Sequence, residues 1–157
     1  MDHMRRGAAQ SNAAYWSLGL QTLVGGIIMY LVMFVMIDGL DIFYNNLNML
    51  YMTLMMVAPM VVLMIFAMRH MFPSRTVNAV LIGVSLIAFF GSFGLIRTQK
   101  TIGDTSFLRS MIPHHSGAIL MCREARLSDP AVIGLCKSIE LSQRQEIDEM
   151  KSILARH

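Results

Sequence analysis

The distribution of apolar and polar residues divides the chain into three long apolar blocks and a more polar C-terminal part. The blocks run from about 18 to 37, 49 to 68 and 77 to 96, and none contains a charged residue. Each is long enough to cross a bilayer, which takes about 20 residues of helix. The pattern therefore predicts an all-α protein with three transmembrane helices.

Amphipathic periodicity replaces continuous hydrophobicity after residue 104. Asp104 is a suitable N-cap, and Asp129 and Pro130 are suited to begin a second helix. Two stripes with steps of three and four residues follow these signals. Both are typical of packed amphipathic helices, so we expect an antiparallel two-helix hairpin. The stripes are Phe107, Met111, His114, Ala118, Met121 and Ala125, then Val132, Cys136, Ile139, Gln143, Glu146, Met150 and Ile153.

The charge distribution predicts how the chain lies in the membrane. The loop from 38 to 48 has two acidic residues and no Lys or Arg, whereas basic residues precede the first block and separate the second from the third. Basic loops tend to stay cytoplasmic. We therefore expect a cytoplasmic segment 1–17, a three-span region 18–98 and an extracytoplasmic hairpin domain 104–157. Three basic residues just beyond the third span oppose this orientation: Arg97, Lys100 and Arg109.

Overall composition narrows the functional classes. Hydrophobic residues make up 55% of the chain and charged residues 15%, so membrane lipid is an expected partner. The net charge of +3 comes from scattered residues rather than a basic stripe, so nucleic-acid binding is not expected. The sequence has no G-x-S-x-G, P-loop or H-E-x-x-H motif, and we expect no enzymatic activity. Sixteen methionines, however, are an excess that calls for an explanation.

Adjacent histidines flanked by methionines are the strongest candidate site. Imidazole and thioether groups suit Cu(I) or Ag(I) much better than Mg²⁺ or Ca²⁺. A folded hairpin would bring Glu146 close enough to orient one imidazole from outside the metal's own ligand shell. An alternative is a polar layer that fixes the register of the two helices and binds no metal. The expected ligands are Met111, His114, His115, Met121 and Met150.

The two cysteines, Cys122 and Cys136, face each other if the hairpin turn is centred near residue 129. In an oxidising compartment they could form a disulfide. Two buried thiols or two thiolate ligands for copper are the alternatives.

Methionines also follow one face of the second apolar block. Their spacing of three or four residues could form a thioether ladder that passes Cu(I) across the membrane. Methionine is also a flexible filler of helix packing, so the stripe has a structural explanation as well. The candidates are Met52, Met56, Met60, Met64 and Met68, with Met49 and Met71 at the two ends.

Residues 104–154 resemble the bacterial domain-of-unknown-function family 305. The resemblance lies in Asp104, Phe107 and M-x-x-H-H-x-x-A-x-x-M from Met111, followed by I-x-x-x-Q-x-x-E-I-x-x-M from Ile139. It implies a ferritin-like helical bundle and, for some members, periplasmic copper binding and metal tolerance. Many members have two hairpins that make four helices, whereas this chain has one. Two short helices alone bury little apolar area, so we expect a homo-oligomer that completes a four-helix bundle.

Together these observations predict a bacterial inner-membrane protein whose extracytoplasmic hairpin binds, buffers or hands over copper or silver. Two other hypotheses remain. The protein could be a structural or assembly module in which the His/Gln/Glu layer only fixes register. It could also be a Cu(I) transporter that uses the transmembrane methionine stripe.

Overall fold

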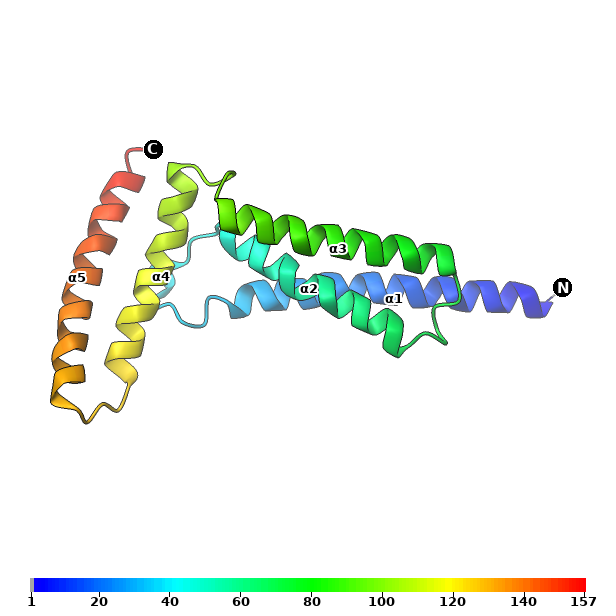
Figure 1. Cartoon of the computed structure of the whole chain (residues 1–157), viewed down its shortest axis with the longest axis horizontal. Coiled ribbons are helices and arrows are strands. Elements are labelled where there is room, and N and C mark those ends of the chain that lie inside the picture. The colour runs from blue at the N-terminus through cyan, green and yellow to red at the C-terminus, as the bar shows by residue number, and fades with distance from the viewer. Residues whose placement is uncertain (1) are drawn as a thin grey trace. The chain divides into compact units, whose positions relative to one another are not determined.

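The structure is a computed structural model that describes residues 2–157, with side chains described from Asn12 onward. Part of the predicted segment 1–17 therefore lies outside the described side chains. Throughout the described residues the ordered elements are helical, which confirms the all-α class (Figure 1). They are α1 (Asp2–Val32), the 3-10 helix η1 (Leu40–Ile42), α2 (Leu47–Ala67), α3 (Arg75–Thr98), α4 (Asp104–Glu124) and α5 (Pro130–Leu154).

The chain forms two compact units. The first contains the residues up to Tyr30 together with Leu50–Gln99, and the second contains Leu31–Met49 together with Lys100–His157. The sequence had divided the chain into consecutive segments. In the structure, the connection between the first two spans instead belongs to the same unit as the C-terminal hairpin.

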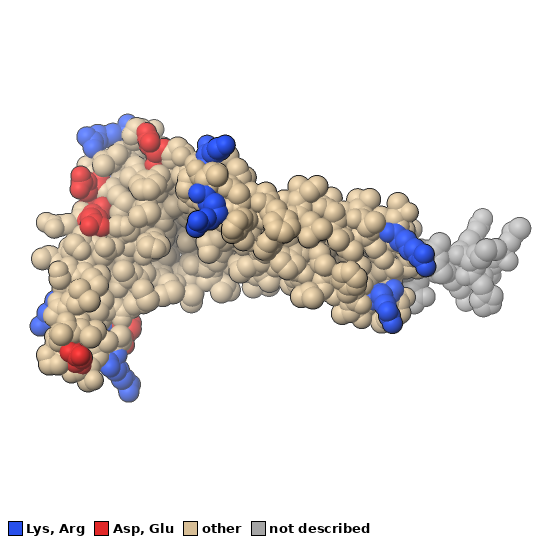
Figure 2. Space-filling view, in the orientation of Figure 1, with Lys and Arg blue, Asp and Glu red and all other residues tan. Residues whose placement is uncertain are grey.

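The first unit is built from three helices that are long and apolar enough to cross a membrane: Asn12–Val32, Leu47–Ala67 and Arg75–Thr98. On the face shown in Figure 2, Lys and Arg lie near the ends of these helices and the middle is uncharged. The second and third spans agree closely with the expected blocks. The first begins and ends earlier than expected, because residues 33–36 form turns and belong to the second unit.

Side chains from all three spans meet in the core of the first unit. Leu18 of α1 is buried against Val61 and Ile65 of α2, and Leu81 of α3 packs beside them. At one end the Tyr15 hydroxyl donates a hydrogen bond to Oδ1 of Asn78 over 2.8 Å. This bond ties the start of the first span to the start of the third.

The C-terminal hairpin packs α4 against α5 in antiparallel directions (Figure 1). Asp129 caps α5 as predicted, since its Oδ1 accepts a hydrogen bond from the backbone N–H of Ala131 over 2.7 Å. The prediction that Asp104 is the cap of α4 was wrong by one residue, because Gly103 is the N-cap and Asp104 is the first helical residue. There its carboxylate still lies close to the positive end of the helix dipole.

The hairpin has two faces with different surroundings. The first, which we call the loop-covered face, packs against residues 38–46 and consists of Ile112, Ser116, Ile119 and Ile147, all buried. The second, which we call the open face, has no covering segment among the described residues of its unit. It consists of Phe107, His114 and Met121 on α4, with Leu135 and Glu146 on α5, all of them exposed.

Candidate functional site

The candidate histidines lie midway along α4. The helix runs without interruption through Pro113, although proline lacks the N–H that would bond to the carbonyl four residues earlier. Consecutive helical residues point in directions about 100° apart, so His114 and His115 leave the helix on different sides. Their ring centroids are 6.0 Å apart and the ring planes meet at 60°.

His115 is the histidine that turns toward α5. Its Nδ1 lies 2.8 Å from Oε2 of Glu146, and its side chain is only 14% exposed. The two atoms are in contact, but the ring N–H is not aligned on the carboxylate oxygen as a hydrogen bond requires. Gln143 donates from Nε2 to the same oxygen over a long 3.4 Å. Glu146 was expected close to one imidazole, and in the structure that imidazole belongs to His115.

His114 belongs to the open face and is exposed. The place beside Glu146 and Gln143 is occupied by its neighbour His115 instead. The reason is rotational, because a step of one residue moves the side chain by more than a quarter turn around the helix. The two imidazoles therefore border one edge of the hairpin without both entering the α4–α5 seam.

The methionines expected as ligands separate into three environments. Met111 is partly buried one helical turn before His114 and His115, within reach of both. Met121 is 54% exposed and lies two turns beyond His114, roughly 10 Å along the axis at 1.5 Å per residue. Met150 packs against the buried isoleucines of the loop-covered face. Of these three methionines, Met111 therefore lies nearest to the histidines along α4, Met121 lies two turns away, and Met150 lies against the isoleucine cluster.

The donor set available in one copy of the hairpin is small. No group of three or more His, Cys, Asp or Glu side chains is arranged to hold a metal ion among the residues that the structure describes. What the hairpin does bring together is one imidazole against one carboxylate, with a second imidazole and a thioether a turn or less away. This set can supply two nitrogens and one sulfur to a soft ion, which falls short of an enclosed site.

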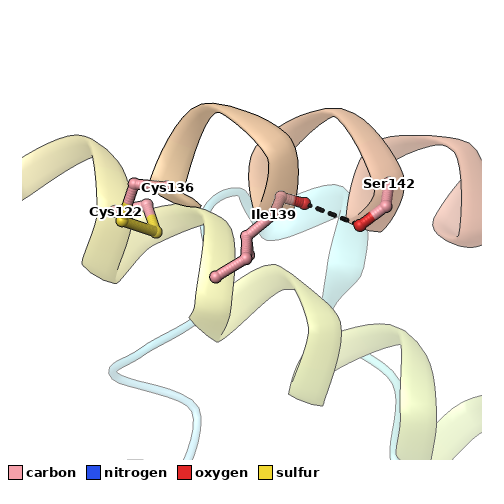
Figure 3. Close-up of a disulfide and its surroundings, with 4 residues drawn as sticks. All are labelled: Cys122, Cys136, Ile139 and Ser142. Atoms are coloured by element: carbon pink, nitrogen blue, oxygen red, sulfur yellow. Dashed lines mark hydrogen bonds between the residues drawn. A yellow bond between two sulfur atoms is a disulfide. The ribbon is translucent and has the colours of Figure 1, made fainter. Parts of the chain in front are cut away.

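The two cysteines are joined in a disulfide close to the hairpin turn. Cys122 of α4 bonds Cys136 of α5 with their Cα atoms 5.3 Å apart (Figure 3). The close-up also shows the Ser142 hydroxyl donating to the carbonyl of Ile139, one turn back on α5. The disulfide fixes the register of α4 against α5, so it also fixes His115 opposite Glu146.

The first connection contributes polar contacts that the sequence analysis did not foresee. The backbone N–H of Asp38 donates to the hydroxyl of buried Ser116 over 2.7 Å, and Asp38 also pairs with Arg123. Lys151 of α5 donates to Oδ2 of Asp41 over 2.8 Å. The available signal was charge, because the loop has two acids and no cation while α4 and α5 carry basic residues.

These contacts change the pKa values of the groups involved. The hydrogen bond from Lys151 lowers the pKa of Asp41, and the same bond raises the pKa of Lys151. The pKa of Arg123 is raised, chiefly by its hydrogen bond to Glu124 and then by Asp38. Each shift favours the charged form of the group, so the contacts hold the loop on the hairpin as ion pairs.

The methionine stripe of α2 is divided between core and surface. Met64 and Met68 pack against the core of the first unit, whereas Met52 and Met56 are exposed. An apolar cavity of about 360 Å³ lies among the three spans, and its lining residues include no methionine and no histidine. The stripe therefore does not line this cavity. The remaining member, Met60, comes within 3.5 Å of the position that a Cβ on Gly25 would occupy.

Fold and site together define a helical protein with three potential membrane spans and a disulfide-bonded hairpin. The family model described as "Domain of unknown function (DUF305)" matches residues 94–154. The chain is also 40% identical over 112 residues to "Uncharacterized protein L153" of Acanthamoeba polyphaga mimivirus. The aligned region covers 69% of this chain and 71% of that protein. The chain belongs to the DUF305 family, as its motifs predicted. No solved structure matches it.

Proposed function

We propose that the hairpin binds a soft monovalent metal ion, Cu(I) or Ag(I), next to the membrane and buffers it or hands it over. The observation that supports this most directly is the position of His115. Its Nδ1 lies against Glu146, so Nε2 is the nitrogen left to bind a metal. Metal-binding histidines commonly donate the other ring N–H to a carboxylate, which orients the ring, and Glu146 lies within the distance of such a bond from His115.

The neighbouring side chains determine which metal fits. Met111 and His114 both lie within a turn of His115 and offer one thioether and one further imidazole. Thioethers favour Cu(I), and imidazole suits copper well, whereas Mg²⁺ and Ca²⁺ require several oxygen ligands. Glu146 is the only carboxylate in contact with the described histidine pair. This donor set therefore supports a soft monovalent ion.

We place the hairpin on the extracytoplasmic side. With three spans, the first connection and the C-terminal hairpin must lie on the same side, and the contacts of Asp38 and Asp41 with the hairpin agree with this. The first connection has no Lys or Arg, which favours the outside. The disulfide between Cys122 and Cys136 also suits an oxidising compartment. A C-terminal alkaline phosphatase fusion should be active, and activity of a C-terminal cytoplasmic reporter instead would contradict the assignment.

Metal binding is tested by competition of the full-length protein, in detergent, with a chromogenic Cu(I) chelator. The double variant His114→Ala/His115→Ala should lose the tight site. The matched control is His70→Ala/His157→Ala, which also removes two imidazoles, both of them exposed, but leaves the hairpin site intact. Unchanged Cu(I) affinity in the first variant, or equal loss in both, would refute the proposal.

The second candidate function is a structural module, and the same contact supports it. Apposed His115 and Glu146, with Gln143 beside them, could serve only as a polar layer that fixes helix register. This function predicts no tight metal binding in the titration above. It also predicts that Glu146→Gln, which keeps a polar partner for His115, has little effect on folding.

A further inference from the structure

The open face of the hairpin is unusual for an exposed helix surface. Phe107 is 51% exposed and Met121 is 54% exposed, and His114 lies between them at intervals of seven residues. Residues at this interval share one side of a helix, and the partly buried Met111 and Ala118 complete the row. The stripe has no charged residue along the length of α4. Such a continuous uncharged stripe is typical of a helix that packs against another helix.

The same face extends onto α5. Leu135 is 60% exposed, and the Glu146 side chain is 47% exposed while its carboxylate contacts His115. Ile147 and Lys151 point to the other side, where they meet the first connection. Residues 135 and 146 therefore lie together on the side of α5 that the connection leaves uncovered. The hairpin presents an apolar surface with polar groups at its middle.

Polar groups in the middle of this surface indicate what covers it. A lipid surface would satisfy Phe107 and Met121 but would place the exposed His114 imidazole and the 47% exposed Glu146 side chain in an apolar medium. A second copy of the chain instead places its own His114 and Glu146 opposite the polar middle of the open face. Phe107 and Met121 lie seven residues before and after His114. In a two-fold interface centred on His114, in which the same surface faces itself, these two different apolar side chains would therefore lie opposite each other.

We propose that two copies of this chain pair through the open face, with their α4 helices antiparallel about His114, and bind one Cu(I) or Ag(I) ion between them. In this arrangement the two His114 imidazoles meet at the two-fold axis. Phe107 of each copy meets Met121 of the other, a favourable sulfur–aromatic contact. The metal site rests on the proposed function, whereas the pairing does not. A metal site shared between two copies also explains why one copy offers an incomplete donor set.

Cysteine cross-linking in full-length protein tests the pairing and its direction. Both native cysteines are already bonded to each other, so a new cysteine has no free thiol partner within its own chain. Under mild oxidation His114→Cys should form a covalent dimer. Phe107→Cys should not, since antiparallel helices separate the two copies of residue 107 by roughly 20 Å at 1.5 Å per residue. Lys137→Cys, exposed on α5 away from the open face, is the matched control.

The outcomes are distinct. Cross-linking of His114→Cys alone supports the two-fold pairing. Cross-linking of both His114→Cys and Phe107→Cys indicates parallel helices and overturns it, as does the absence of any dimer or equal dimer formation by Lys137→Cys.

Metal stoichiometry separates this inference from the proposed function. Two copies sharing one site should bind about one Cu(I) per two chains, and His114→Ala should reduce affinity at least tenfold while leaving the His115–Glu146 contact in place. Tight binding of one ion per chain with no dimer would keep the proposed function and overturn the pairing. Dimer formation without metal binding would keep the pairing and overturn both the shared metal site and the proposed function.

Discussion

The two faces of the hairpin use the same helices in different ways. On the loop-covered face, Ile112 and Ser116 are fully buried, and the first connection supplies both apolar contacts and ion pairs. On the open face, Phe107 and His114 have no such cover. One face is therefore completed by the chain itself, and the other is left for a ligand or a partner. Stability should depend on the first face and binding on the second.

The largest expected effect on stability comes from Ile112→Ala. Ile112 has no exposed surface and contacts the other isoleucines of the loop-covered face. Removing its side chain leaves a cavity, so the hairpin should lose about 2–5 kcal/mol. Native-state hydrogen exchange of α4 and α5 amides, in the full chain in detergent, measures this directly.

Phe107→Ala is the matched change on the open face. Phe107 is 51% exposed, so its removal should weaken the hairpin by well under half as much in monomeric protein. Equal losses in the two variants would show that the faces do not differ in the way the burial indicates.

The disulfide lies in the seam between the two faces, and its removal should have the next largest effect. It joins residues 14 apart in the sequence. A loop of this length corresponds to about 3 kcal/mol in the chain-entropy model. Cys122→Ser/Cys136→Ser should therefore speed amide exchange in both helices, with the strongest change near the turn. This variant leaves Ile112 unchanged, so its effect can be compared directly with that of Ile112→Ala. Unchanged amide exchange near residue 129 would contradict the prediction.

Local sequence signals predicted much of this fold. The spans could be predicted because an uncharged apolar block of about 20 residues has few alternatives to a transmembrane helix. The start of α5 could be predicted because Asp129 caps the helix and Pro130 suits its first position, and both effects are local to the backbone. The predicted N-cap of α4, Asp104, was wrong by one residue. Gly103 has the extended backbone of the N-cap but no side chain that could have signalled it in the sequence.

The site was harder to predict, because it depends on rotation about the helix and on a distant loop. Adjacent His114 and His115 look equivalent in the sequence, but only one of them can face α5. Nothing local to Met150 indicated that it would pack against an isoleucine cluster that includes Ile42 of the first connection. Contacts between segments so far apart in the chain leave only a weak charge pattern in the sequence, such as acids in one segment and cations in another.

Ser116→Ala should have a smaller effect than the loss of Ile112 or of the disulfide. The hydroxyl of Ser116 accepts the backbone N–H of Asp38 over 2.7 Å, and the residue has no exposed surface. Without the hydroxyl this N–H lacks its partner, which should cost about 1–3 kcal/mol. The effect should be local to residues 38–46, so exchange there should accelerate while α5 changes little. Ser110→Ala is the control, because that hydroxyl bonds within α4 and to Asn48 but not to Asp38.

The smallest expected effect is the pH dependence of the loop's attachment through Asp41 and Lys151. The lowered pKa of Asp41 means that its contribution is present above the ordinary value of about 3.9 and is lost as pH falls through the lowered pKa. The raised pKa of Lys151 means that its contribution is present below about 10.4 and is lost as pH rises through the raised pKa. A nitroxide label at exposed Leu40 should therefore show constant loop mobility near neutral pH and greater mobility at both extremes.

Because the pair is exposed, 1 M salt should also weaken it at pH 7, since the screening length at this salt concentration is about 3 Å. Asp41→Asn should remove the acidic limb and most of the salt effect. If the label is equally mobile at all pH values in the unmodified loop, then apolar contacts and the Ser116 hydrogen bond hold the connection, and its ion pairs add nothing.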